Sequence, residues 1–191
     1  MTNPLLAPSP LPYQLPPFAD ITVEHYRPAF DKALALHDAE ITAITDNPAD
    51  PTWENTVEAL ECSGQDLDRV MAVFGNLSGT DVTEEMEEIA ADIYPRLSAH
   101  YDAIYQNEVL YARLKEATPP ADDAEGQRLH EHLLRTFARK GADLDAAGKA
   151  RLSEINQRLS ALSEEFGRNL MASTRERAVS FTEEELEGLP A

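Results

Sequence analysis

Cysteine is nearly absent from this chain, because Cys62 is the only one among 191 residues. A single cysteine excludes an internal disulfide, and with it the cross-linked framework of small secreted domains. The neighbours Glu61 and Asp66 are acidic and disfavour a thiolate, so a nucleophilic role for Cys62 is not expected. We therefore interpret Cys62 as a small residue of a helix.

Long apolar runs and an excess of basic charge are missing as well. No stretch reaches the roughly 20 apolar residues that span a bilayer, and the N-terminus lacks the basic and apolar regions of a signal peptide. The 16 Lys and Arg residues are outnumbered by 35 Asp and Glu residues, which gives a net charge of -19. Because an acidic surface repels phosphate groups, we expect no nucleic-acid partner and no membrane partner. The missing apolar span and signal peptide favour a cytoplasmic location.

Segments with the two-residue period of a strand are also absent, and six of the 13 prolines lie between Pro4 and Pro17. Proline cannot donate to a helix, and it biases the preceding residue toward extended backbone. Apolar side chains alternate with these prolines, as in an arm that lies along a surface. The sequence therefore predicts an extended, proline-rich arm over residues 1–21 and an all-α, multi-helix antiparallel bundle over residues 22–191.

Apolar residues three or four apart predict two amphipathic helices in the first part of this bundle. Thr22 is expected to cap the first, which ends near Asn47. Thr52 is expected to cap the second, which continues through Gly64 and ends at Gly79. The predicted buried faces are Tyr26, Phe30, Leu34, His37, Ile41 and Ile44 for the first helix, and Val57, Leu60, Leu67, Met71, Phe74 and Leu77 for the second.

Capping signals predict three further helices before residue 142. Pro95 falls inside the first of them and should bend it near Tyr94. These helices are expected to begin at Asp81 with Glu84, at Asn107, and at Asp122 with Glu125, and to end near Ile104, Ala117 and Gly141.

The last long helix has the strictest apolar pattern of the chain, a narrow seam with alternating spacings of three and four. Such a seam is typical of paired antiparallel helices in a bundle. Thr182 and Glu185 mark one more helical start, and the sequence then stops as if cut within a longer protein. The seam consists of Leu152, Ile155, Leu159, Leu162 and Phe166, followed by Asn169 or Leu170.

The histidines do not have the spacing of a helical zinc site, which needs ligands three or four residues apart. His130 and His132 are two apart, so their rings should diverge around a helix. His37 lies on an apolar face with Glu40 one turn later, and a hydrogen-bonded core histidine is the favoured interpretation. The five histidines are His25, His37, His100, His130 and His132, and they form no His-Glu-x-x-His motif.

Nucleophilic and phosphate-binding motifs are missing too. No Gly-x-Ser-x-Gly elbow occurs, and no basic residue lies near Ser63–Gly64 in sequence to activate a hydroxyl. The carboxylates of Glu84, Glu85, Glu87, Glu88 and Asp92 have the arrangement of a solvated helix face. We therefore predict no catalytic, cofactor-binding or metal-ligating residue in this chain. A helical module that binds or shapes something remains, whereas a small hydrolase lacks its catalytic groups.

Two stretches and their order nevertheless resemble a known family. The first contains Asn3-Pro4-Leu5-Leu6, Leu11-Pro12-Tyr13, Pro17-Phe18, Ile21 and Tyr26-Arg27-Pro28-Ala29-Phe30; the second runs from Thr52-Trp53-Glu54-Asn55-Thr56-Val57 to Glu61, with Ser63-Gly64, Leu67, Arg69-Val70 and Phe74 after it. Together they resemble the start of the peptidyl-dipeptidase and oligopeptidase A branch of the thimet-oligopeptidase family of zinc peptidases. The resemblance continues near Gly141–Ala142 and from Lys149 to Asn169.

This resemblance implies that residues 22–191 form the helical N-terminal domain of a longer peptidase that cleaves short peptides. In that family the zinc and the general-base glutamate lie on a downstream His-Glu-x-x-His helix, so no catalytic or metal residue is carried over to this sequence. The expected partners are the missing catalytic domain and, in the whole enzyme, short peptides held in a channel of which this chain forms a wall. The alternative is a free-standing helical module that binds another protein.

Overall fold

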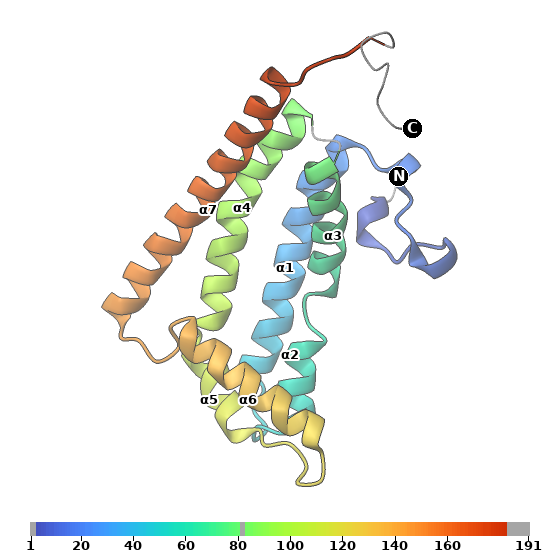
Figure 1. Cartoon of the computed structure of the whole chain (residues 1–191). Helices are drawn as coiled ribbons and strands as arrows, with labels where there is room; N and C mark the ends of the chain where they lie inside the picture. Colours follow the sequence, from blue (N-terminus) through green and yellow to red (C-terminus); the bar gives the residue numbers. More distant parts are fainter. Residues whose placement is uncertain (1–2, 81–82, 183–191) are drawn as a thin grey trace.

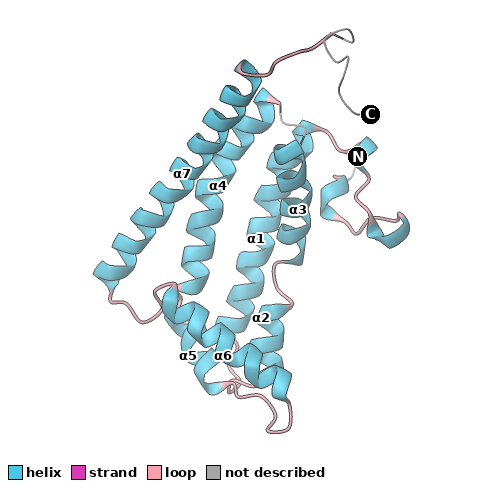
Figure 2. Cartoon of the chain, in the orientation of Figure 1, coloured by secondary structure: helices cyan, strands magenta, loops and turns pink. Residues whose placement is uncertain are grey.

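The computed structural model describes residues 3–80 and 83–182, and these residues form helices joined by loops (Figure 1). No strand occurs in these two ranges, which confirms the all-α class (Figure 2). Short 3₁₀ turns precede the bundle at Pro4–Leu6, Pro12–Gln14, Phe18–Asp20 and Val23–His25, and a π-type turn lies at Trp53–Glu58. The helices are α1 (Tyr26–Thr45), α2 (Ala59–Glu61), α3 (Gln65–Thr80), α4 (Glu84–Tyr105), α5 (Glu108–Glu116), α6 (Ala124–Arg139) and α7 (Ala146–Glu176).

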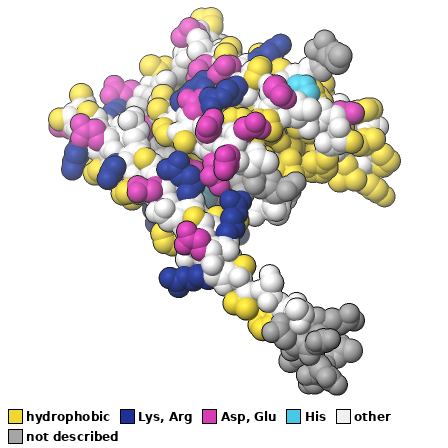
Figure 3. Space-filling view, turned by 90° about the horizontal axis from the view of Figure 1, so that it is seen from above, with side chains coloured by type: hydrophobic (Ala, Val, Ile, Leu, Met, Phe, Trp, Pro, Cys, Tyr) yellow, Lys and Arg dark blue, Asp and Glu magenta, His cyan; other side chains and the backbone are white. Residues whose placement is uncertain are grey.

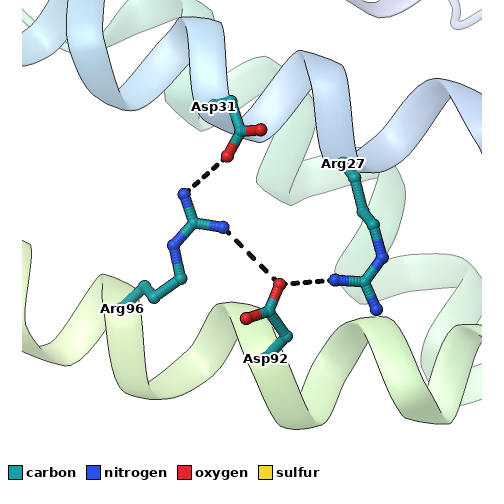
Figure 4. A network of polar contacts seen from close by, with 4 residues as sticks. All are labelled: Arg27, Asp31, Asp92 and Arg96. Carbon is teal, nitrogen blue, oxygen red and sulfur yellow. Dashed lines mark hydrogen bonds and ion pairs between the residues drawn. The ribbon is translucent and has the colours of Figure 1, made fainter.

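Consecutive long helices run antiparallel, as predicted. α3 returns along α1, α4 reverses again, and α7 runs back along α4, while the shorter α5 and α6 lie across one end (Figure 1). Because two reversals separate them, α1 and α4 are parallel. Two exposed contacts join these parallel helices, Arg27 with Asp92 and Arg96 with Asp31 at 2.6 Å, and within α4 Arg96 also lies 3.5 Å from Asp92 (Figure 4). Exposed ion pairs of this kind stabilise a fold by about 0–1 kcal/mol each, so they set register more than stability.

The core consists of two apolar clusters stacked along α1. The first cluster is centred on Phe74, whose ring meets the rings of Tyr26 and Phe30 edge to face at 5.1 and 5.3 Å between centroids. The second cluster is centred on Phe137, which packs against Tyr105 and Tyr111. The first also contains Leu5, Ala29, Ala33, Leu34, Leu67, Val70, Val73, Met86, Ile89, Ala90, Ile93 and Leu97, and the second Ile41, Ile44, Val57, Ile104, Leu110, Leu114, Ala117, Leu133 and Ala142.

The predicted helix caps are correct at some positions and displaced at others. The hydroxyl of Thr52 accepts from the amide of Asn55, whose side chain accepts from the amide of Thr52. Before α4 the cap is Thr83, which accepts from the amide of Met86 at 3.3 Å; the predicted cap Asp81 lies outside the described residues. Before α6 the cap is Asp123 rather than Asp122.

Gly64 breaks the second predicted helix, so the expectation of one helix from Thr52 to Gly79 was wrong. α2 ends at Glu61, a turn follows, and α3 starts at Gln65. The φ angle of Gly64 is +76°, a left-handed conformation that glycine adopts without steric cost. α3 then continues one residue past Gly79 to Thr80.

α4 contains Pro95 and is continuous from Glu84 to Tyr105. An interior proline removes one backbone hydrogen bond and does not have to end the helix. The bend expected near Tyr94 stays a prediction.

The N-terminal arm is a series of short turns and loops rather than one extended segment. Its first turn is anchored, because Leu5 is buried in the first cluster and the Asn3 side chain donates to the carbonyl of His25 at 2.7 Å. Farther along, the arm exposes Tyr13, of which 98% is accessible, together with Leu11, Leu15 and Phe18.

Candidate functional site

Two histidines from different helices meet in the middle of the bundle. His37 on α1 and His100 on α4 are both buried, and Nδ1 of His37 lies 3.0 Å from Nε2 of His100. The chain of contacts extends in both directions: Nδ1 of His100 lies 3.1 Å from a carboxylate oxygen of Asp38, and Nε2 of His37 lies 3.2 Å from Oγ of Ser63. These four residues, Ser63, His37, His100 and Asp38, are called the histidine layer below.

The turn at Gly64 places Ser63 in this layer. The Gly64 amide donates to a carboxylate oxygen of Glu40 at 2.7 Å, which ties the turn to α1. Burial lowers the pKa of His37, the neighbouring His100 lowers it further, and the carboxylates of Glu40, Asp68 and Asp38 act in the opposite direction. Beside the layer is an open cavity of about 170 Å³, lined by His37, Ser63 and Gly64 among others.

A serine close to a histidine raises the question of acyl transfer, which also needs donors for an oxyanion. The two amides at the turn are already used, since Ser63 N donates to Leu60 O at 3.1 Å and Gly64 N to Glu40. The Ser63 hydroxyl lies 2.7 Å from the Leu60 carbonyl, which it bonds as a donor. The nearby carboxylates of Glu40 and Asp68 would also repel a developing anion. The geometry is therefore that of a structural polar layer and does not provide for acyl transfer.

Sequence reasoning was right about His37 and incomplete about its surroundings. His37 is a hydrogen-bonded core histidine, as predicted. No basic residue lies near Ser63 in the sequence, but α1 brings His37 to it from 26 positions earlier in the chain. The pairing with His100 was missed, since the spacing rule compares residues within one helix. One signal was available: both histidines occupy apolar stripes at the positions where leucine or isoleucine is otherwise found.

The other histidines make separate local contacts. His130 bonds the Leu114 carbonyl at 2.6 Å and His132 lies 3.5 Å from the Thr136 hydroxyl, so their rings diverge as predicted. His25 contacts the backbone amide and hydroxyl of Thr22. Cys62 is exposed in the turn after α2 rather than inside a helix.

The acidic residues of α4 form a surface, as predicted. Glu84, Glu85, Glu88 and Asp92 are exposed, and Glu87 is half-buried. Across residues 3–80 and 83–182, no group of three or more His, Cys, Asp or Glu side chains is arranged to hold a metal ion. The zinc site that the family resemblance implies thus has no matching set of residues in this part of the chain. Within the same ranges, no helix combines the length and apolar character needed to cross a membrane.

Substituting Gly64 tests how tightly the turn fits the histidine layer. A Cβ atom at Gly64 would lie 2.9 Å from Cε1 of His37, and alanine also disfavours the positive φ angle. We expect Gly64→Ala to lower the free energy of unfolding by about 1–3 kcal/mol in urea titrations. Gly167→Ala is the matched control, because a Cβ there meets no atom within 4 Å and helical alanine adds about 0.5–1 kcal/mol. Equal effects of the two substitutions would contradict the tight fit.

A second candidate site is the apolar seam of α7, most of which is exposed. Two polar contacts join α7 to α4 and to the residue after it: Asn156 donates to a carboxylate oxygen of Asp102 at 2.7 Å, and the Gln106 amide lies 3.4 Å from the hydroxyl of Ser153. Glu164 is half-buried on the same side, and burial raises its pKa. No residue of α7 is fully buried. The contact between α7 and α4 thus includes hydrogen bonds between polar side chains.

α7 pairs antiparallel with α4, but the seam itself is largely exposed, with Leu159 and Leu170 bordering cavities between the two helices. Phe166 is 69% exposed, the largest value in the seam. The exposed seam residues are Ile155, Leu159, Leu162, Phe166 and Leu170. The seam is accompanied by a second exposed apolar region on the N-terminal arm, visible in Figure 3 as hydrophobic side chains gathered on the side where Figure 1 places the arm. Apolar rows of this length mark surfaces that bind another protein segment.

Comparison with known proteins gives this surface a context. The chain is 36% identical over 177 residues to dipeptidyl carboxypeptidase of Escherichia coli (strain K12), a match that covers 91% of this chain and 26% of that protein. It is 30% identical to oligopeptidase A of Salmonella typhimurium over all of this chain and 28% of that protein. No protein-family model matches the sequence. The chain spans about a quarter of the length of the curated relatives it matches. It is therefore homologous to part of the dipeptidyl carboxypeptidases and oligopeptidases A of the thimet-oligopeptidase family.

Proposed function

We propose that this chain is the non-catalytic N-terminal helical domain of a zinc-dependent peptidyl-dipeptidase or oligopeptidase. In this proposal residues 1–21 are an arm, residues 22–191 are the domain, and the whole enzyme cleaves short peptides in the cytoplasm. Its partner is the remaining, catalytic part of the same protein, which holds the zinc. The relatives are named dipeptidyl carboxypeptidase and oligopeptidase A, and about three quarters of each lies outside the match.

The exposed seam of α7 is the observation that carries the proposal. The large apolar residues in the seam of this 31-residue helix remain exposed in the described part of the chain, residues 3–80 and 83–182. Helices of globular proteins bury such rows, whereas these seam residues stay exposed beside the α4–α7 contact. The missing part of the protein supplies the cover. A helical wall confines and orients a peptide while the catalytic groups act from the other side of the channel.

Reconstitution tests the proposal. We expect the gene to continue beyond codon 191 and to encode His-Glu-x-x-His. The 191-residue chain mixed with the separately produced downstream part should hydrolyse a short peptide in the presence of zinc, and the chain alone should not. Peptide hydrolysis by the chain alone would overturn the non-catalytic role. A stop codon directly after Ala191 would instead favour the alternative, a free-standing module whose seam binds an unrelated protein.

A further inference from the structure

The histidine layer lies at the boundary between the two apolar clusters. On α1, His37 falls between Leu34 of the first cluster and Ile41 of the second. On α4, His100 falls between Leu97 and Ile104 in the same way. The layer therefore replaces one apolar layer of the α1–α4 contact by hydrogen bonds between ring nitrogens. Whether these hydrogen bonds form depends on the number of protons on the two rings, because a ring nitrogen donates only when it is protonated and accepts only when it is not.

The contacts of the layer are fully satisfied when the two rings share one added proton. Asp38 accepts from Nδ1–H of His100, and Nε2–H of His100 then donates to Nδ1 of His37. Nε2–H of His37 donates to the Ser63 hydroxyl, which in turn donates to the Leu60 carbonyl. Without that proton, either the Ser63 hydroxyl must donate to both His37 and Leu60 and can serve only one of them, or Nδ1 of His100 faces the Asp38 carboxylate without a hydrogen. The observed distances thus match a layer that holds a single added proton.

A second added proton is incompatible with this arrangement. With both rings charged, the N–H of His37 and the N–H of His100 would point at each other across 3.0 Å. The contact would be lost, and two like charges would lie in one buried layer. We infer that His37 and His100 form a one-proton joint between α1 and α4, which opens when acid supplies the second proton. This inference is independent of the proposed peptidase role.

The surroundings favour the first proton and do not remove the obstacle to the second. Carboxylates face the layer from three elements: Asp38 and Glu40 on α1, Glu61 at the end of α2, and Asp68 on α3. Tyr101 on α4 contacts both rings and stays neutral, since burial raises its pKa. α6 contributes the apolar Leu133 and Phe137 to the adjoining cavity.

The sign of the pH dependence follows from the proton count. In the unfolded chain the two imidazoles are independent, and both take a proton below about pH 6.5. The folded layer holds one, and burial lowers the pKa of His37. A depressed pKa gives stability that is present above the unfolded value and is lost as the pH falls. The unfolded chain binds one proton more than the folded chain. The unfolding equilibrium constant should therefore rise about tenfold for each pH unit by which the pH falls.

Urea titrations of the 191-residue chain between about pH 8 and about pH 5 measure this difference. His37→Gln removes the ring that the folded layer leaves without a second proton, so the tenfold change in the unfolding equilibrium constant per pH unit should be absent from this variant. The matched control is His132→Gln, because His132 is exposed and should leave the slope unchanged. Carboxylates contribute equally to all three proteins and cancel in the comparison. Identical slopes for wild type and His37→Gln would overturn the inference.

A second measurement covers the case in which His37→Gln does not fold. Nitrogen NMR of the native wild-type chain distinguishes protonated from unprotonated ring nitrogens. We expect His37 and His100 together to gain one proton between about pH 8 and the onset of acid unfolding, with Nδ1 of His37 unprotonated in the acid form. Two fully protonated rings in the folded chain would overturn the one-proton joint.

Discussion

Replacing Phe74 by alanine should lower the free energy of unfolding by about 3–5 kcal/mol, the largest stability effect expected in this chain. Phe74 has no exposed area and lies at the centre of the first cluster. The substitution removes its edge-to-face contacts with Tyr26 and Phe30 and leaves a cavity that the packed helices α1 and α3 cannot fill. Since small domains are stable by about 5–15 kcal/mol, this substitution should remove a large part of the total free energy of unfolding.

Phe166→Ala is the control for Phe74→Ala, because the residue type and helical setting are the same. Phe166 is 69% exposed, so its loss should change the free energy of unfolding by less than about 1 kcal/mol. Urea titrations followed by circular dichroism at about 25 °C measure both values. Equal destabilisation by the two substitutions would mean that Phe74 is not the centre of the core.

The sequence predicted the helices of this fold well because their periodicity is local. Every residue of the predicted α1 face from Tyr26 to Ile44 is buried, and Thr52 makes the predicted capping contacts. Thr83 and Asp123 replaced Asp81 and Asp122 as caps because several candidate residues stand within two positions of each helix start, and pattern alone does not rank them. Local rules therefore locate helices more accurately than they locate helix ends.

The candidate sites were less predictable because they depend on contacts between helices. His37 and His100 are 63 positions apart, and only the packing of α1 on α4 brings their rings together. Gly64 fits an apolar stripe as a small residue, yet the turn into α3 gives it a positive φ angle and His37 leaves no room for a Cβ atom. The seam of α7 was recognised as apolar, but a pattern on one helix does not identify which neighbour covers it. The neighbour of the seam is determined by the surface that packs against it.

The second large effect is expected on the affinity between this chain and the catalytic part of the proposed enzyme. If the seam docks on the catalytic part, as the proposed function requires, Phe166→Asp places a charge in a buried apolar contact. Interface anchors of this size contribute about 2 kcal/mol or more, and a buried unpaired charge adds to the loss. We expect the affinity between the two parts, and the peptidase activity at limiting concentration, to fall about a hundredfold.

Ala161→Asp is the matched control for this experiment, since it adds the same charge to an exposed position of α7 outside the seam. Its effect on affinity should stay within about threefold, because a charge at the rim of an interface or outside it is solvated. Both variants should unfold at nearly the wild-type urea concentration, which separates docking from folding. A hundredfold loss with Ala161→Asp, or none with Phe166→Asp, would show that the remaining part of the protein docks elsewhere. The exposed residues of the arm around Tyr13 would then be the next surface to substitute.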